Sequence, residues 1–101
     1  MAEIARLTTP AFTYKPSAVE MSSITKVFFV LKQGENTITK DITTATTSTN
    51  GFTWVFTQTE TQSLKVGRAV GQVDYLTASG VRYTTVPKIF EITDSAINEV
   101  I

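Results

Sequence analysis

Residues 50–56 read Asn50-Gly51-Phe52-Thr53-Trp54-Val55-Phe56 and join a turn signal to a run of strict alternation. Asn50-Gly51 is the most specific hairpin signal in the chain, because both residues tolerate the positive φ of a type I′ turn. Aromatic side chains at Phe52, Trp54 and Phe56 then alternate with Thr or Val. A period of two is typical of a strand with one buried face. The stretch therefore predicts a hairpin that leads into a strand with an aromatic core face.

Similar short runs occur on both sides of this stretch. Nineteen threonines, together with frequent Val, Ile and Phe, give a composition that favours strands. Further strands are predicted over residues 11–15, 25–33, 37–42, 68–77 and 81–92, the last interrupted at Pro87. Short strands at roughly 8–12-residue spacing, with turns between them and no long helix, indicate an all-β antiparallel sandwich of seven to eight strands. A small barrel remains an alternative.

Other local features refine this picture. Ser17 to Glu20 and Thr57 to Glu60 both have capping-box spacing, and each predicts one helical turn. Gly71 in the middle of a strand indicates a bulge or a bulky neighbour, for which Trp54 is the obvious candidate. Residues 43–49 contain only Thr, Ser and Ala. They predict a thin edge strand or loop, in preference to a glycosylated or ligand-binding tract.

The chain divides into three parts by pattern. Residues 1–10 lack a clear period and are expected to form an N-terminal arm. Residues 11–93 carry the alternating runs and are expected to form the β-sandwich. Residues 94–101 form a C-terminal short helix or tail, in which Asp94 can cap and the apolar residues share one face.

Composition argues against several classes of function. Nine Lys and Arg balance nine Asp and Glu, whereas nucleic-acid binding requires an excess of basic residues. The absence of Cys and His removes the usual nucleophile, general base and zinc ligands. Asp74 lies inside a predicted strand, and no second carboxylate is placed beside it. We therefore expect no enzyme activity, no catalytic, cofactor or metal site, and no membrane span.

Two apolar stretches are candidates for protein contact. If Val27, Phe29 and Leu31 face the core, then Phe28 and Val30 face outward. They are expected to form a protein interface; cover by the same domain, or ordinary exposure, are the alternatives. A second candidate set lies in the C-terminal segment and consists of Ile97, Val100 and Ile101. This segment either docks on a neighbouring subunit, folds back on its own sandwich or frays. Surface aromatics such as Tyr83 or Phe90 offer an alternative function as a sugar-binding platform.

Several segments together resemble a group of small phage proteins. The segments are 27–34, 56–61, Gly67, 71–75, 91–94 and 98–100. They are similar to roughly hundred-residue proteins encoded in tail or baseplate regions of phages and prophages of Gram-positive hosts. That group is similar in design to the immunoglobulin-like N-terminal domain of baseplate upper proteins. The resemblance extends from about Thr9 to Ile101, and its motifs describe turns rather than chemistry.

The resemblance implies an immunoglobulin-like fold and a structural role in a virion. It implies a homo-oligomer that contacts other tail or baseplate proteins, made in the host cytoplasm and carried in the virion, without a cofactor. Two departures stand out. Phe28 and Val30 lie where such proteins often carry a polar residue. Residues 43–49 are less varied in side-chain type than expected from the group's pattern.

Overall fold

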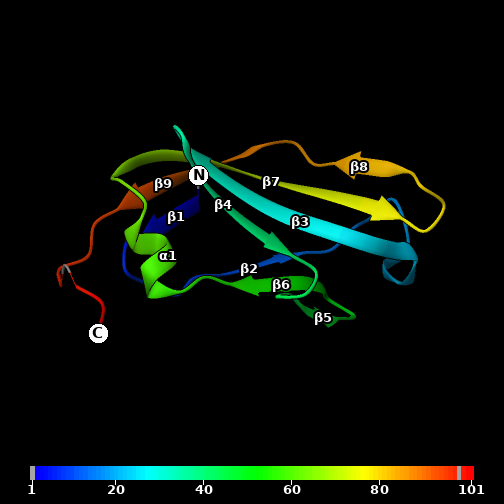
Figure 1. The fold of residues 1–101 in the computed structure, drawn as a ribbon, viewed down its shortest axis with the longest axis horizontal. Coiled ribbons are helices and arrows are strands. Elements are labelled where there is room, and N and C mark those ends of the chain that lie inside the picture. Colours follow the sequence, from blue (N-terminus) through cyan, green and yellow to red (C-terminus); the bar gives the residue numbers. More distant parts are fainter. Residues whose placement is uncertain (1, 98) are drawn as a thin grey trace.

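The computed structural model describes residues 2–97 and 99–101, and most of these residues lie in or next to strands (Figure 1). In chain order the elements are β1 (Ala2–Ala5), β2 (Ala11–Tyr14), η1 (Met21–Ser23, a 3₁₀ turn), β3 (Ile24–Gln33), β4 (Asn36–Asp41), β5 (Thr46–Ser48), β6 (Gly51–Val55), α1 (Gln58–Gln62), β7 (Gly67–Thr77), β8 (Arg82–Thr84) and β9 (Lys88–Thr93). The long strands β3 and β7 run along the longest dimension of the molecule, about 46 Å.

The strands form two sheets that face each other (Figure 1). The larger sheet has the order β1-β9-β7-β3-β4, with β8 also paired to β7, and the smaller has the order β2-β6-β5. All pairs are antiparallel except β1 with β9. In the variable-type immunoglobulin plan the strands B, E and D form one sheet and G, F, C and C′ the other. The present order matches that plan, so the fold is the expected immunoglobulin-like β-sandwich.

The core between the sheets is built from aromatic rings. The side chains of Phe52, Trp54 and Phe56 are buried, as their alternation predicts. Across the sandwich, the Phe29 ring lies 5.7 Å from the Trp54 ring and 5.3 Å from the Phe12 ring, between centroids. Contacts of this kind stabilise a core beyond the area that the rings bury.

Gly71 in β7 has bulky neighbours, but Trp54 is not among the nearest. A Cβ at Gly71 would lie 2.6 Å from Cε2 of Phe90 and 3.4 Å from Cζ of Phe29. The expectation of Trp54 was wrong because β9, which carries Phe90, pairs with β7 next to Gly71. Local sequence does not reveal that neighbour.

The predicted hairpin joins β5 to β6, but its turn lies one residue earlier. Ser48 pairs with Gly51, so Thr49 and Asn50 form the loop. Among the described turn residues, the positive φ falls on Gly51 (118°) and not on Asn50. A Cβ at Gly51 would lie 2.3 Å from the Tyr14 carbonyl oxygen. This close approach of β2 explains why glycine is required there.

Only one of the two capping boxes forms. The Thr57 hydroxyl accepts a hydrogen bond from the Glu60 N–H (3.2 Å), and the Glu60 carboxylate accepts one from the Thr57 N–H (2.8 Å). At the other site the helical turn is η1, displaced from residues 17–20, and its N-cap Glu20 makes no side-chain bond. The spacing alone was therefore insufficient to predict a capped helical turn at residues 17–20.

The N-terminal end of the chain differs from the expected arm, and the described C-terminal residues take the second of the two expected forms, a tail rather than a short helix. Residues 2–5 pair in parallel with β9, and Ile4 is buried opposite Ile92. This strand is too short for a period to appear in the sequence. In the C-terminal segment, residues 94–97 and 99–101 form a tail without helix. The Asp94 carboxylate accepts a hydrogen bond from the Ser95 N–H (3.1 Å) and forms an ion pair with Arg6 (2.8 Å). A helix of two turns at a chain end is marginal in water.

Candidate functional site

The outward face of the larger sheet carries a diagonal line of apolar side chains across β9, β7 and β3. Phe28 and Val30 point away from the core, as their alternation with buried Val27, Phe29 and Leu31 predicts. On the neighbouring strands, Ile89 lies directly opposite Val70, and Leu76 lies two residues from the partner of Phe28. We call this set the outer strip; it consists of Phe28, Val30, Val70, Leu76 and Ile89.

The outer strip is incompletely covered by its own domain. The exposed fractions are 38% for Phe28, 41% for Val70 and 42% for Ile89, while Val30 and Leu76 are half-buried. Cover by the same domain, one of the alternatives for Phe28 and Val30, is therefore only partial. What distinguishes these residues from single exposed apolars elsewhere is that they occupy directly opposite or diagonal positions on one face of three paired strands.

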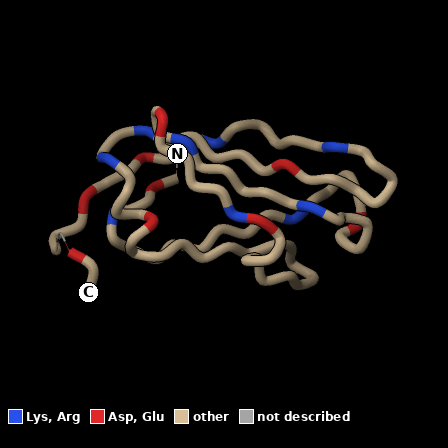
Figure 2. Tube along the Cα trace, in the orientation of Figure 1, with Lys and Arg blue, Asp and Glu red and all other residues tan. Residues whose placement is uncertain are grey.

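Charges of both signs surround the outer strip. Arg82 bonds the Asp74 carboxylate at 2.6 Å, and the Thr84 hydroxyl also donates to it. Hydrogen bonds first from Thr84 and then from Arg82 hold the pKa of Asp74 below its usual value. Arg68 lies opposite Glu91 on the next strand. Figure 2 shows Lys, Arg, Asp and Glu interspersed over the chain without a large region of one sign.

The described residues offer little for catalysis or metal binding. No three Asp or Glu side chains within residues 2–97 and 99–101 gather as a metal-binding group. Asp74, the acid singled out from the sequence, is engaged by Arg82 and Thr84. None of the helices in the described part is long and apolar enough to cross a membrane.

The two aromatics considered for a sugar platform do not form one. Phe90 is buried between the sheets, so its interpretation as a surface residue was wrong. The Tyr83 ring stacks on the Tyr75 ring, with centroids 5.1 Å apart, and packs against the core. The structure therefore does not bring Tyr83 and Phe90 together on the surface.

The described residues of the C-terminal tail bond to their own domain through Asp94 and through the backbone of Ile101. The Gln58 amide donates to the Ile101 carbonyl (3.0 Å) and accepts from the Ile101 N–H (2.8 Å). The side chains remain largely uncovered, with exposed fractions of 54% for Ile97, 50% for Val100 and 82% for Ile101. The structure does not bring them together with Phe28 and Val30, which lie on the sheet face.

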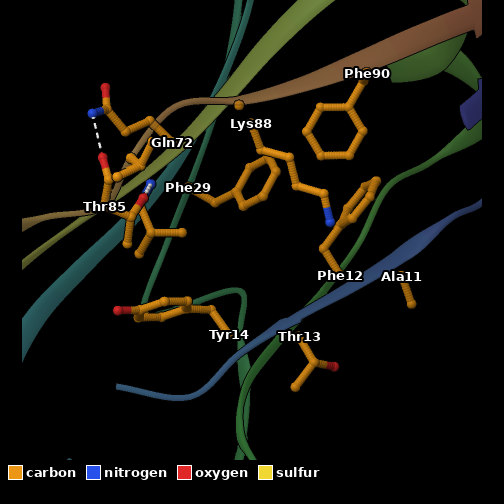
Figure 3. A pocket seen from close by; sticks show the side chains of 12 residues that line it. Ala11, Phe12, Thr13, Tyr14, Phe29, Gln72, Thr85, Lys88 and Phe90 are labelled. Carbon is orange, nitrogen blue, oxygen red and sulfur yellow. Dashed lines mark hydrogen bonds between the residues drawn. The ribbon is translucent and has the colours of Figure 1, made fainter. Parts of the chain in front are cut away.

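A cleft that sequence reasoning did not find lies between the two sheets, beside β2. It has a volume of about 370 Å³ and is lined by residues from β2, β3, β7, β9 and the β8–β9 connection. Figure 3 shows the rings of Phe12, Phe29 and Phe90 around it, with the Lys88 side chain reaching in among them. One wall is fixed where the Gln72 amide donates to the Thr85 carbonyl (2.6 Å). Alternation of apolar and polar residues predicts which side chains face inward, but it does not predict where a cleft remains between the two sheets.

Comparisons with known proteins give fold-level likeness only. No family model matches the chain, and no curated protein matches it. Among solved structures, one described as murine CRIg is similar with a TM-score of 0.44 and 12% identity. The alignment covers 93% of this chain and 91% of that chain.

Proposed function

We propose that this chain is a non-enzymatic structural protein that assembles by protein–protein contact, with the outer strip packing against a second copy. The observation that carries the proposal is the line of partly exposed apolar side chains on three paired strands. Burying such a line removes apolar surface from water, which is the main driving force for association.

A second copy suits this surface for an electrostatic reason. A two-fold contact places the same patch of both subunits face to face, so the patch must complement itself. A surface with interspersed positive and negative groups meets that condition more easily than a surface of one sign. The formal net charge of zero adds little repulsion between copies.

The setting that we propose for this assembly is a phage tail or baseplate, where the chain also contacts other tail or baseplate proteins. The support is the sequence resemblance described above, together with a small domain that exposes contact surface. In this setting the chain is repeated by the symmetry of the particle and is carried in the virion.

Light scattering coupled to size-exclusion chromatography tests the self-assembly. We expect a mass above that of one chain for the wild type and a smaller species for Phe28→Asp, because a charge at the centre of the contact is costly to bury. Val55→Asp is the matched control, since Val55 is exposed on the smaller sheet, away from the outer strip. A wild-type monomer at all concentrations contradicts the proposal, as does equal loss of mass in the control.

The virion setting needs its own measurement. Particles released from cells that encode the chain are purified on a density gradient and analysed by mass spectrometry. Peptides of this chain should co-purify with intact particles. Their presence in the cell lysate but absence from the particles contradicts the virion role and leaves self-assembly standing.

A sugar-binding module remains the second candidate, and one observation favours it. Phe28 borders a hollow of about 290 Å³ together with Lys26, Asp74 and Arg82, which combines an aromatic face with polar groups. Saturable binding to a cell-wall polysaccharide that is lost in Phe28→Ala, from a protein that stays monomeric, supports this candidate over the first.

A further inference from the structure

Strand β2 has an edge on which no strand pairs within the described residues. The Phe56 N–H donates to the Pro10 carbonyl (2.9 Å), and this pair fixes the alternation of hydrogen bonds along the β2–β6 ladder. It follows that the backbone groups of Phe12 and Tyr14 point toward β6, whereas those of Ala11 and Thr13 point away from it. The Thr13 and Thr53 hydroxyls are 2.8 Å apart, as expected for the closer, non-hydrogen-bonded pair. Ala11 and Thr13 therefore offer N–H and C=O groups to an additional strand.

The cleft described above lies directly alongside this edge. Its interior is the aromatic core itself, since Phe29 and Phe90 line it while being buried. In the immunoglobulin plan the smaller sheet contains a further strand, A, next to the position of β2. Here β1 pairs with β9 instead, so the cleft occupies the place of that strand.

The charge inside the cleft is positive. Among the described residues that line the cleft, Lys88 is the only charged one, and its ammonium lies 5.7 Å from the centroid of the Phe90 ring. Among the described residues, no carboxylate lies within ion-pair distance of Lys88. A strand that enters the cleft is thus favoured when apolar side chains flank an acidic one.

The C-terminal tail of this chain has that chemistry. Its residues from 94 onward include Asp94 and Glu99 and no Lys or Arg. Ile97, Glu99 and Ile101 are spaced by two, so an extended segment directs all three to the same side. Five extended residues span roughly 16 Å, enough to run the length of the four-residue β2. In its own domain the tail leaves the side chains of Ile97, Val100 and Ile101 largely exposed.

We propose that the cleft beside β2 receives the C-terminal tail of a second copy of this chain as an added strand. The backbone of the tail pairs with Ala11 and Thr13, Ile97 and Ile101 pack toward the aromatic rings, and Glu99 pairs with Lys88. Addition of a strand to an open sheet edge is a general mode of recognition. When each of two identical chains inserts its tail into the other, the two contacts are equivalent and the assembly closes as a dimer. This inference rests on the proposed self-assembly and adds a second, separate contact to it.

The experiment uses the full-length Phe28→Asp protein, in which the contact through the outer strip is removed. We expect light scattering to show an assembly of at least two chains in this background. Thr13→Pro added to it should yield monomers, because proline removes the N–H at the open edge. Thr13→Val is the matched control, since it keeps that N–H and loses only the hydroxyl contact with Thr53. Proline is tolerated at an edge position that faces solvent, so the variant should fold.

Charge reversal identifies the tail as the occupant. Lys88→Glu alone and Glu99→Lys alone should each weaken the assembly by about tenfold, and the two together should restore it. A synthetic peptide of residues 94–101, added in excess, should compete and lower the mass. Hydrogen exchange of the Thr13 amide should be slow in the assembly and fast in the monomer.

The outcomes separate this inference from the proposed function. If Phe28→Asp is already monomeric while the wild type is not, the proposed insertion of the tail into the cleft is overturned and the contact through the outer strip stands. If Thr13→Pro lowers the wild-type mass but Phe28→Asp does not, the contact through the outer strip is overturned and the tail contact stands. A change caused by Thr13→Pro that charge reversal and the peptide do not reproduce overturns the assignment of the tail.

Discussion

At the scale of single residues, the glycines show what sequence can and cannot predict. Asn50-Gly51 correctly indicated a hairpin, yet of these two residues only Gly51 has a positive φ, and its backbone also passes close to the Tyr14 carbonyl. Gly71 was correctly expected to accommodate a bulky neighbour, but the neighbour is Phe90 rather than Trp54. In both cases the local requirement was visible in the sequence. The identity of the contacting residue was not, because it depends on which distant strand lies alongside.

Gly71→Ala should destabilise the domain by roughly 1–3 kcal/mol, the usual range for an extra methyl group in a packed core. The new Cβ would meet the Phe90 ring at 2.6 Å, which forces one of the two to move. Urea denaturation measures the change. Phe90→Leu should relieve the contact, so the double variant should lose less stability than the sum of the single variants. Strictly additive losses would show that the contact is not the cause.

At the scale of elements, the two capping boxes had equal spacing and different outcomes. At Thr57 the box is reinforced by tertiary contact, because the Lys40 ammonium lies 2.7 Å from the Glu60 carboxylate. Burial raises the pKa of Glu60, but hydrogen bonds from Lys40 and the Thr57 N–H outweigh it and hold the pKa below the usual 4.5. Glu20 makes no side-chain cap bond, and it forms no ion pair with any residue that the structure describes. The same limit applies to β1, since only its pairing with β9 makes it a strand.

Thr57→Ala should lower the free energy of unfolding by about 1 kcal/mol, because it removes the hydroxyl that accepts the Glu60 N–H. Thr59→Ala, an exposed position inside α1, is the control. It should change stability by less than roughly 0.5 kcal/mol, since alanine is the better helix former. Thermal and urea unfolding of both variants give the comparison; a larger loss at Thr59 than at Thr57 would contradict the role of the cap.

At the scale of the whole molecule, the class of fold followed from alternation and turn spacing, whereas the arrangement of strands did not. A period of two predicts which side chains share a face, so the orientation of Phe28 and Val30 was confirmed. It does not predict that Val70 and Ile89 extend the same face across β7 and β9, nor that β2 has an edge on which no described strand pairs, because both depend on the order of strands. The outer strip was thus found in part from sequence, and the cleft not at all.

Self-assembly also predicts how thermal stability depends on concentration. If folded chains associate and unfolded chains do not, mass action raises the melting temperature as concentration rises. For a dimer, a tenfold increase adds about 0.7 kcal/mol per chain, or roughly 3–5 °C for a domain of this size. The wild type should show this rise in differential scanning calorimetry. The rise in melting temperature with concentration should be smaller in Phe28→Asp. A wild-type melting temperature that does not depend on concentration contradicts association.

The single tryptophan of the chain, Trp54, is fully buried between the sheets, and its indole N–H donates to the Asp41 carbonyl at 2.9 Å. Its fluorescence therefore comes from one defined site, shielded from water in the native domain and hydrated after denaturation. The protein thus carries an intrinsic optical probe at its centre. Because the indole lies away from the surface, its emission follows the integrity of the interior, while association at the exterior leaves it largely unchanged.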